Sequence, residues 1–355
     1  MKFLQDFSFK ELSDILTEYK EPKFRIRQLF EASHKYKSYF EMSNIPFTLK
    51  NKLIEDGISD KPVEIIETLT SKDGTQKFLF KLFDGNIIEG VLMKYKYGYT
   101  QCVSTQVGCR MHCAFCASGL NGLVRNLSSG EILGQVLAVN KLLGGEIGDK
   151  RKVTNIVLMG SGEPLDNYDN TVAFLRNVSD ENGICISPRN ISLSTSGIVP
   201  KIYDLANENM PVNLTISLHF PFDDERKEIM PVAKKYTIKE ILAACENYFN
   251  KTKRRYIFEY VLIYGKNDTK CHADELIKLL SKRPCHVNLI RLNTVKENDF
   301  KAVNDKNAYK FAEYLNNHGI STTVRRRMGD DIEGACGQLR RKYIENSFDS
   351  EINLN

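Results

Sequence analysis

Three cysteines crowd into one short stretch of the chain, GCRMHCAFCASG at residues 108–119. Cys109, Cys113 and Cys116 have the spacing C-x3-C-x2-C, and no fourth cysteine follows closely. Thiolates this close in sequence can converge on one iron–sulfur cluster, which cysteine sulfurs normally hold. Because three ligands leave one iron of a four-iron cluster free, the spacing predicts an open site for a substrate or cofactor.

A zinc ion with His112 as its fourth ligand is the main alternative for this stretch. Adjacent His112 and Cys113 cannot easily both reach one tetrahedral ion, and the chain has no second C-x2-C pair. A buried trio of structural cysteines is weaker still. The stretch therefore favours an iron–sulfur cluster.

Five predicted strands end in small, polar or metal-binding residues, which an apolar core does not need. The first strand, QCVSTQ, leads into the cysteine loop. The others end near Gly162 and Glu163, Ser194, the run Ser217, Leu218 and His219, and Asn293. Parallel α/β folds place their sites at the carboxyl ends of the strands, so these residues predict a ligand site.

The spacing of hydrophobic residues, which predicts helices and strands, changes along the chain. Helical spacing comes first, then alternating strands separated by KDG and DG turns, then repeated strand–helix units. We expect four parts: a helical domain at 1–60, an antiparallel linker at 61–98, a parallel α/β domain at 99–320, and a C-terminal strand and tail at 321–355. The strand–helix alternation predicts a parallel sheet, either doubly wound or an incomplete barrel.

Composition limits the class of protein. The chain has 355 residues, 42% hydrophobic and 27% charged, with nine cysteines and a net charge of +5. It has no long apolar run, and its first residues turn polar too quickly for a secretory signal, so we expect a cytoplasmic monomer without a membrane span. In a reducing compartment, thiols serve as ligands or catalysts more often than as disulfides. Basic clusters at 251–255, 325–327 and 340–342 suit phosphate backbones.

The cysteine spacing, at the first strand of an incomplete barrel, resembles the radical S-adenosylmethionine (SAM) superfamily. The resemblance implies a [4Fe-4S] cluster on Cys109, Cys113 and Cys116, whose open iron binds the amino and carboxylate groups of SAM. Reduction then cleaves SAM to a 5′-deoxyadenosyl radical. Gly162 and Glu163 match the superfamily's glycine–glutamate motif, which binds the methionyl ammonium. A carboxylate suits that cation.

Further motifs resemble one family over nearly the whole chain, the RlmN/Cfr RNA methyltransferases. These motifs are CVSTQVGC, MGSGEPL, LSTSG, ISLH, IMPV, HVNLI and GACGQL. The resemblance implies an incomplete (β/α)6 radical-SAM barrel with a small N-terminal helical RNA-binding accessory domain and a β-hairpin linker. It also implies methylation of one adenosine in the peptidyl-transferase centre of 23S rRNA. RlmN acts at C2, and also on the adenosine beside the tRNA anticodon, whereas Cfr acts at C8.

The family resemblance assigns roles to the remaining candidate residues. Cys336 would carry a methyl group as S-methylcysteine, Cys102 would resolve the protein–RNA adduct through a transient disulfide with Cys336, and Glu89 would accept a proton. Two SAM molecules would be consumed in each turnover. The matched cofactor-binding positions are Ser194, Ser217, Leu218, His219 and Asn293.

Short motifs near the predicted site match two branches of this family, RlmN and Cfr. MGSGEPL and GDDI resemble RlmN, whereas Phe220-Pro221-Phe222, Arg291 and Thr294 depart from the usual RlmN patterns. The sequence NLIR and the SPR at Ser187 lean towards Cfr. We favour C2 methylation of 23S rRNA and of tRNA, with a flavodoxin-like reductant; C8 methylation is the alternative. A second alternative is an iron–sulfur or zinc RNA-binding protein without methylation, against which Cys336 argues because a binding module has no need of it.

Overall fold

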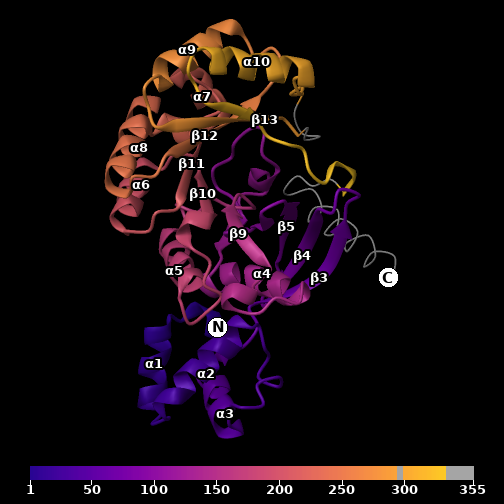
Figure 1. Ribbon diagram of the computed structural model, residues 1–355, viewed down its shortest axis with the longest axis vertical. Helices are drawn as coiled ribbons and strands as arrows, with labels where there is room; N and C mark the ends of the chain where they lie inside the picture. The colour runs from indigo at the N-terminus through magenta and orange to yellow at the C-terminus, as the bar shows by residue number, and fades with distance from the viewer. Residues whose placement is uncertain (294–298, 333–355) are drawn as a thin grey trace.

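An open sheet of ten strands organises the structure (Figure 1). The computed structural model describes residues 1–293 and 299–332. In spatial order the strands are β14 (Thr322–Val324), β13 (Cys285–Arg291), β12 (Tyr256–Leu262), β11 (Asn213–Ser217), β10 (Ile191–Thr195), β9 (Val153–Leu158), β6 (Gly98–Cys102), β5 (Ile87–Tyr95), β4 (Gln76–Leu82) and β3 (Val63–Thr70). The strands from β14 to β6 are parallel, and β5, β4 and β3 continue the sheet antiparallel.

Every crossover between neighbouring parallel strands contains a helix. The helices are α4 (Ser129–Leu142), α5 (Tyr168–Ser179), α6 (Val199–Asn207), α7 (Asp223–Ile229), α8 (Ile238–Thr252), α9 (Lys270–Leu280) and α10 (Asp305–Asn317). Helices α4 and α8 begin at capping boxes, in which Ser128 and Thr237 receive the backbone N–H of Glu131 and Glu240. This alternation confirms the predicted parallel α/β sheet. No helix in the described ranges is long and apolar enough to cross a membrane.

The antiparallel linker belongs to the same sheet as the parallel strands. It contains three strands, and β5 pairs with β6 in a register that sets Val91 opposite Cys102. The first parallel strand ends at Cys102, earlier than the predicted QCVSTQ segment, because the backbone N–H groups of Thr105 and Gln106 turn towards the Ser161 carbonyl oxygen. Strands β7 (Gln106–Gly108) and β8 (Leu123–Asn126) then form a separate antiparallel pair.

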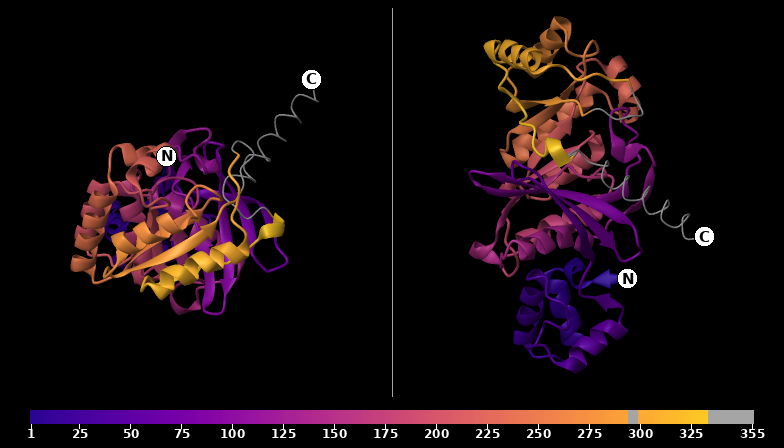
Figure 2. Two further views of the ribbon diagram at one scale, coloured as in Figure 1. Left: turned by 90° about the horizontal axis from the view of Figure 1, so that it is seen from above. Right: turned by 90° about the vertical axis from the view of Figure 1, so that its right-hand side faces the viewer.

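The N-terminal helices form a unit with its own core, below the sheet in the side view of Figure 2. This unit contains β1 (Lys2–Phe3), α1 (Phe9–Glu18), α2 (Lys23–His34), α3 (Phe47–Glu55) and β2 (Ile58–Ser59). Leu12, Leu29 and Leu53 are fully buried in it. Asp6 joins the unit to the sheet domain, because its Oδ1 accepts the Gly130 N–H in the first turn of α4 at 2.6 Å.

Residues 325–332, which we call the strap, connect the two edges of the open sheet. The strap begins beside β13, where the Arg325 N–H donates to the Leu289 carbonyl oxygen at 2.8 Å. It ends at the turn between β3 and β4, where the Gly329 N–H donates to Asp73 Oδ2 at 3.0 Å and the Asp331 carboxylate accepts from Ser71 (Figure 1). The strap therefore spans the opening that the strands leave.

Candidate active site

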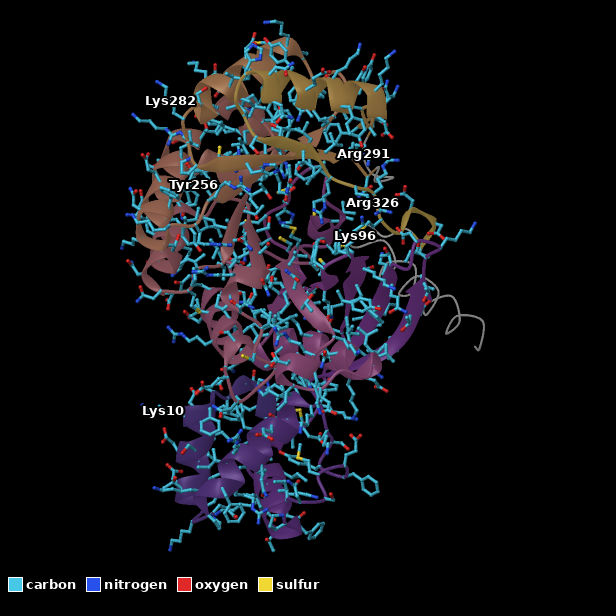
Figure 3. All side chains as sticks on the ribbon, viewed as in Figure 1. Lys10, Lys96, Tyr256, Lys282, Arg291 and Arg326 are labelled. Atoms are coloured by element: carbon cyan, nitrogen blue, oxygen red, sulfur yellow. The ribbon has the colours of Figure 1, made fainter. Side chains whose placement is uncertain are left out.

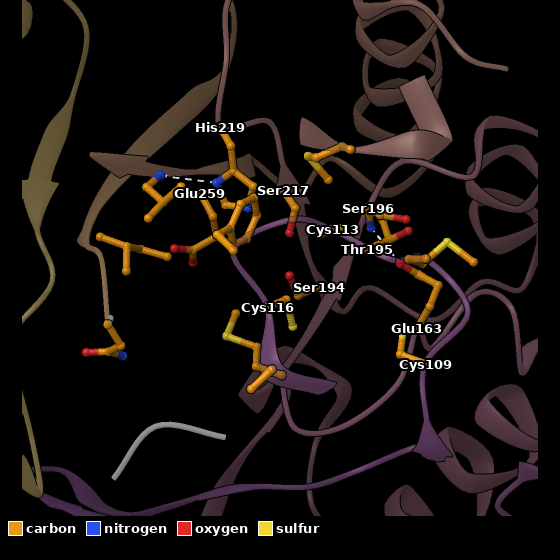
Figure 4. Close-up of a pocket in the computed structure, with 18 of the residues that line it drawn as sticks. Cys109, Cys113, Cys116, Glu163, Ser194, Thr195, Ser196, Ser217, His219 and Glu259 are labelled. Carbon is orange, nitrogen blue, oxygen red and sulfur yellow. Dashed lines mark hydrogen bonds between the residues drawn. The ribbon is translucent and has the colours of Figure 1, made fainter. Parts of the chain in front are cut away.

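A cavity of about 290 Å³ opens at the carboxyl ends of the parallel strands (Figure 4). The predicted residues in its wall are Cys109, Cys113, Cys116, Gly162, Glu163, Ser194, Ser217, His219 and Asn293. Apolar lining comes from Phe115, Leu158, Val261, Ile290 and Leu292. The fold thus brings the cysteine loop and the four other predicted strand ends to one place.

The cysteine loop is fixed to its surroundings by backbone hydrogen bonds. Gly108 has φ +79°, and a Cβ atom there would lie 2.0 Å from the Gly122 carbonyl oxygen, so glycine is required. The Cys109 N–H donates to that same oxygen at 2.9 Å. Further along, the Ala114 N–H donates to the Ile229 carbonyl oxygen, at the end of α7, at 2.9 Å. These bonds hold the loop against the cavity.

The three thiols fit an iron–sulfur cluster by their chemistry. Burial raises the pKa of Cys109 to about 12 and raises the pKa of Cys113 as well, so both stay protonated unless a cation is near. Bound iron would supply that positive charge and convert them to thiolate ligands. All three cysteines line the cavity, and a cluster held by three sulfurs would leave a fourth iron for a cofactor. His112 is exposed and does not line the cavity, which argues against the zinc alternative.

Gly162 and Glu163 form a rigid turn at the end of β9. Gly162 has φ +111°, and a Cβ atom there would lie 2.7 Å from the Gln106 side chain. The Glu163 carboxylate accepts the N–H of Ser196 at 2.6 Å and that of Leu165 at 3.0 Å. Burial raises the Glu163 pKa, whereas these N–H groups favour its charged form. The turn therefore presents an immobile carboxylate that an ammonium group could pair with.

His219 is held in one orientation at the end of β11. Its backbone has φ +59°, its Nδ1 accepts the Val261 N–H at 3.1 Å, and its ring packs edge-on against Phe115. Burial, with a smaller effect of the Arg226 charge, lowers the His219 pKa to about 3. The ring is therefore neutral at pH 7 with its proton on Nε2, where it can act as a donor.

The remaining predicted cofactor residues differ in their placement. Ser194 and Ser217 lie in the cavity wall, and Asn293 lies at its exposed rim. Leu218 does not line the cavity: its side chain is fully buried in the core, and its backbone N–H donates to the Glu259 carbonyl oxygen at 3.1 Å. A role for Leu218 in cofactor binding stays a prediction.

Known proteins match this chain over nearly its whole length. The family model of the radical SAM superfamily matches residues 103–280. A probable dual-specificity RNA methyltransferase RlmN from Clostridium novyi (strain NT) is 50% identical, covering 98% of this chain and 100% of the relative. A relative of the same name from Clostridium perfringens (strain SM101 / Type A) is 52% identical, covering 97% of this chain and 98% of the relative. This chain belongs to the RlmN family of radical SAM RNA methyltransferases.

A solved structure agrees with this assignment. A radical SAM methyltransferase from Sphaerobacter thermophilus superposes with a TM-score of 0.90 at 41% identity, covering 95% of this chain and 99% of that chain. The predicted incomplete α/β barrel and the predicted SAM-dependent RNA methyltransferase class are confirmed. Membership of the radical SAM family implies a [4Fe-4S] cluster and SAM as cofactors, and the relatives' activity implies an RNA substrate.

Two further residues predicted to matter in this RlmN family member, Glu89 and Cys102, lie next to each other on the sheet. Cys102 pairs with Val91, and Glu89 is two residues along β5 on the same face, a diagonal position about 7 to 8 Å away. Both side chains are buried, and neither lines the cavity. Glu89 Oε2 lies 3.5 Å from the buried Lys77 Nζ. Cys336, the predicted methyl carrier, lies outside the described residues.

Sequence reasoning missed two buried charged residues at the site, Glu259 and Arg226. Glu259 lies in the cavity wall, and its Oε2 has no hydrogen-bond partner among the described residues. Burial raises its pKa. An acidic residue inside the apolar strand YIFEYVLI was the available signal. Arg226 is fully buried on α7, and nothing in its local sequence distinguishes it from a surface arginine.

Proposed function

We propose that this enzyme methylates C2 of one adenosine in the peptidyl-transferase centre of 23S rRNA, and also the adenosine beside the tRNA anticodon. The observation that carries the proposal is about 50% identity, over nearly the whole chain, to proteins named dual-specificity RNA methyltransferase RlmN. The cavity supports it, because three thiols, a fixed carboxylate and hydroxyl groups meet there.

Cys109, Cys113 and Cys116 would hold the [4Fe-4S] cluster, and Glu163 would pair with the methionyl ammonium of SAM. Ser194, Ser217, His219 and Asn293, which line the cavity, would bind the ribose and adenine, and Leu218 would contribute through its backbone. When bound and reduced, the cluster and SAM supply a 5′-deoxyadenosyl radical. The apolar wall beside these donors excludes water from the reacting groups.

Protein residues would then transfer the methyl carbon to the RNA through a covalent protein–RNA adduct. The Cys336 thiolate takes a methyl group from one SAM, which leaves as S-adenosylhomocysteine. This methyl group would lose one hydrogen atom to the 5′-deoxyadenosyl radical supplied by a second SAM, leaving 5′-deoxyadenosine, and the methyl carbon would then join adenine C2. Glu89 would accept the C2 proton, and the adduct would return one electron to the cluster, which supplied one for the cleavage of SAM. The Cys102 thiolate attacks the Cys336 sulfur, so that the sulfur–carbon bond breaks, the carbon takes up a proton, and a disulfide forms that a thiol reductant must reopen.

The placement of Glu89 and Cys102 supports these roles. Both are on one face of the sheet, diagonal to each other across β5 and β6. Lys77 Nζ lies 3.5 Å from Glu89 Oε2, so the buried carboxylate has a basic partner beside it. The target base would have to leave its stack to reach these buried groups. We further propose that the enzyme acts as a monomer in the cytoplasm, with a flavodoxin-like electron donor.

The test is anaerobic reconstitution of the enzyme with iron, sulfide and SAM, followed by reaction with dithionite and a 23S rRNA fragment or tRNA. Mass spectrometry of the digested RNA identifies the product. We expect 2-methyladenosine from both RNAs. 8-Methyladenosine would instead establish Cfr-type chemistry, and unmethylated RNA bound by a cluster-loaded protein would favour the RNA-binding alternative.

A further inference from the structure

Two tyrosines stack at the turn between β5 and β6, outside the cavity. The rings of Tyr95 and Tyr97 have centroids 5.0 Å apart and planes inclined by 5°. Tyr95 is half-buried, and its hydroxyl lies 3.6 Å from Met93 Sδ, whereas Tyr97 is 65% exposed. Within the part of the chain that the structure describes, no other ring or cation packs on Tyr97. One face of its ring is therefore supported by Tyr95, and no ring or cation among the described residues covers the other.

Exposed basic residues lie next to this stack in the sequence and on the strap. Lys94 and Lys96 are exposed on either side of Tyr95, and Arg326 and Arg327 are exposed on the strap. None of the four forms a salt bridge with any described residue, whereas many other surface cations do. Figure 3 shows Lys96 and Arg326 on the same side of the molecule. Burial raises the pKa of the Tyr95 hydroxyl, and the charges of Arg325 and Arg326 on the strap partly offset this rise.

The stack is connected to the active site by the strand that carries Glu89. Tyr95 is on the same face of β5 as Glu89, six residues further along. At about 3.3 Å per residue, the two positions are about 20 Å apart. On the strap, Arg325 lines the cavity, and Arg326 is the next residue in the sequence. The stack therefore lies within a few nucleotides' reach of the reacting groups but cannot itself contact the target base.

Exposed aromatic rings beside unpaired cations are typical of surfaces that bind unpaired nucleotides. When a base leaves its stack in the RNA, the adjacent base loses a stacking partner on one face. We propose that Tyr97, supported by Tyr95, is the stacking platform for a nucleobase near the target adenosine, while Lys96 and Arg326 contact the adjoining phosphates. The proposal rests on the proposed RNA methyltransferase function and names a surface for its substrate.

The absence of tryptophan from the chain permits a direct test. Tyr97→Trp would carry the only tryptophan, at the proposed contact. We expect its fluorescence to fall when the cluster-loaded enzyme binds the 23S rRNA fragment, and to change little with heparin, which has charge but no bases. Tyr309→Trp, at a 57% exposed position on α10, is the matched control and should respond to neither. Equal quenching in both variants, or none in Tyr97→Trp with RNA bound, would overturn the proposal.

Affinity measurements separate stacking from charge. Tyr97→Ala should weaken RNA binding roughly 5- to 100-fold, and Tyr97→Phe should bind nearly as wild type, because stacking needs only the ring. Lys96→Ala should instead reduce the salt dependence of binding, by about one unit in the log–log slope. Wild-type affinity in Tyr97→Ala with normal methylation would refute the platform and leave the proposed function intact. Absence of methylation by the wild-type enzyme would refute only the function.

Discussion

The Arg226 Nη2 donates a hydrogen bond to the carbonyl oxygen of Ser196 at 2.7 Å, beneath the active-site cavity. The same guanidinium donates to the carbonyl oxygens of Ser217 at 3.2 Å and Leu218 at 3.1 Å. It thus joins the ends of β10 and β11, where the predicted cofactor residues lie. Burial lowers the Arg226 pKa to about 10, so it remains charged at neutral pH. One arginine therefore fixes the spacing of two strand ends.

Replacing Arg226 with methionine should lower the free energy of unfolding by about 3 kcal/mol or more, because three buried carbonyl groups lose their donor. Urea denaturation measures this loss. Arg27→Met is the control, since that side chain is 70% exposed in a helical ion pair and should change stability by less than about 0.5 kcal/mol. Equal stability of the two variants would contradict the structural role of Arg226.

Glu163→Gln should weaken SAM binding at least about tenfold without loss of the cluster, because the amide keeps the shape but loses the negative charge. Anaerobic calorimetry measures the affinity, and the visible absorbance reports the cluster. Asp224→Asn is the control, because it removes one negative charge from a side chain that is 97% exposed on α7. Unchanged affinity in Glu163→Gln would exclude its pairing with the ammonium.

Asp331→Ala should release the strap from the β3–β4 turn. The Asp331 carboxylate accepts from the Ser71 hydroxyl and from the Lys72 N–H, the latter at 3.1 Å. We expect faster trypsin cleavage after Arg326 and Arg327, since local opening exposes the backbone to protease. Asp330→Ala, its exposed neighbour, provides the control. If both variants are cleaved at the wild-type rate, the contact does not hold the strap.

Acid should weaken the attachment of the N-terminal unit through His34. Burial lowers the His34 pKa to about 4, and its Nδ1 accepts the Ile184 N–H at 3.2 Å. Because the folded pKa lies below the unfolded value of about 6.5, this contribution is complete above pH 6.5 and declines as the pH falls. Between pH 6.5 and pH 5 the loss is about 1.5 kcal/mol. Urea midpoints of His34→Gln should vary less with pH than those of wild type; parallel pH profiles would contradict this.

Cys102→Ala should trap the enzyme covalently on its RNA, because no thiol remains to attack the Cys336 sulfur. A labelled 23S rRNA fragment should migrate with the protein on a denaturing gel. Cys271→Ala, an exposed thiol on α9, should leave the RNA free. Free RNA with Cys102→Ala, while mass spectrometry finds Cys336 methylated, would remove Cys102 from the proposed mechanism.

Several features were determined by the sequence alone, because they depend on neighbours in the chain. The spacing of Cys109, Cys113 and Cys116 sets the donor set within eight residues, and the capping box at Ser128 needs only a partner three positions away. Polar residues at the ends of apolar strands predicted the cavity wall. The parallel sheet followed from the alternation of strands and helices, since few topologies satisfy it.

Other features were decided only by the tertiary structure, because they join residues far apart in sequence. The strap returns to β3 through Asp331 and Ser71, which are 260 positions apart. Arg226 joins two strand ends, and Glu259 places in the cavity an oxygen that no described residue hydrogen-bonds, only when separate crossovers pack together. Local propensity carries no information on such pairings, since burial and long-range register determine which polar groups meet.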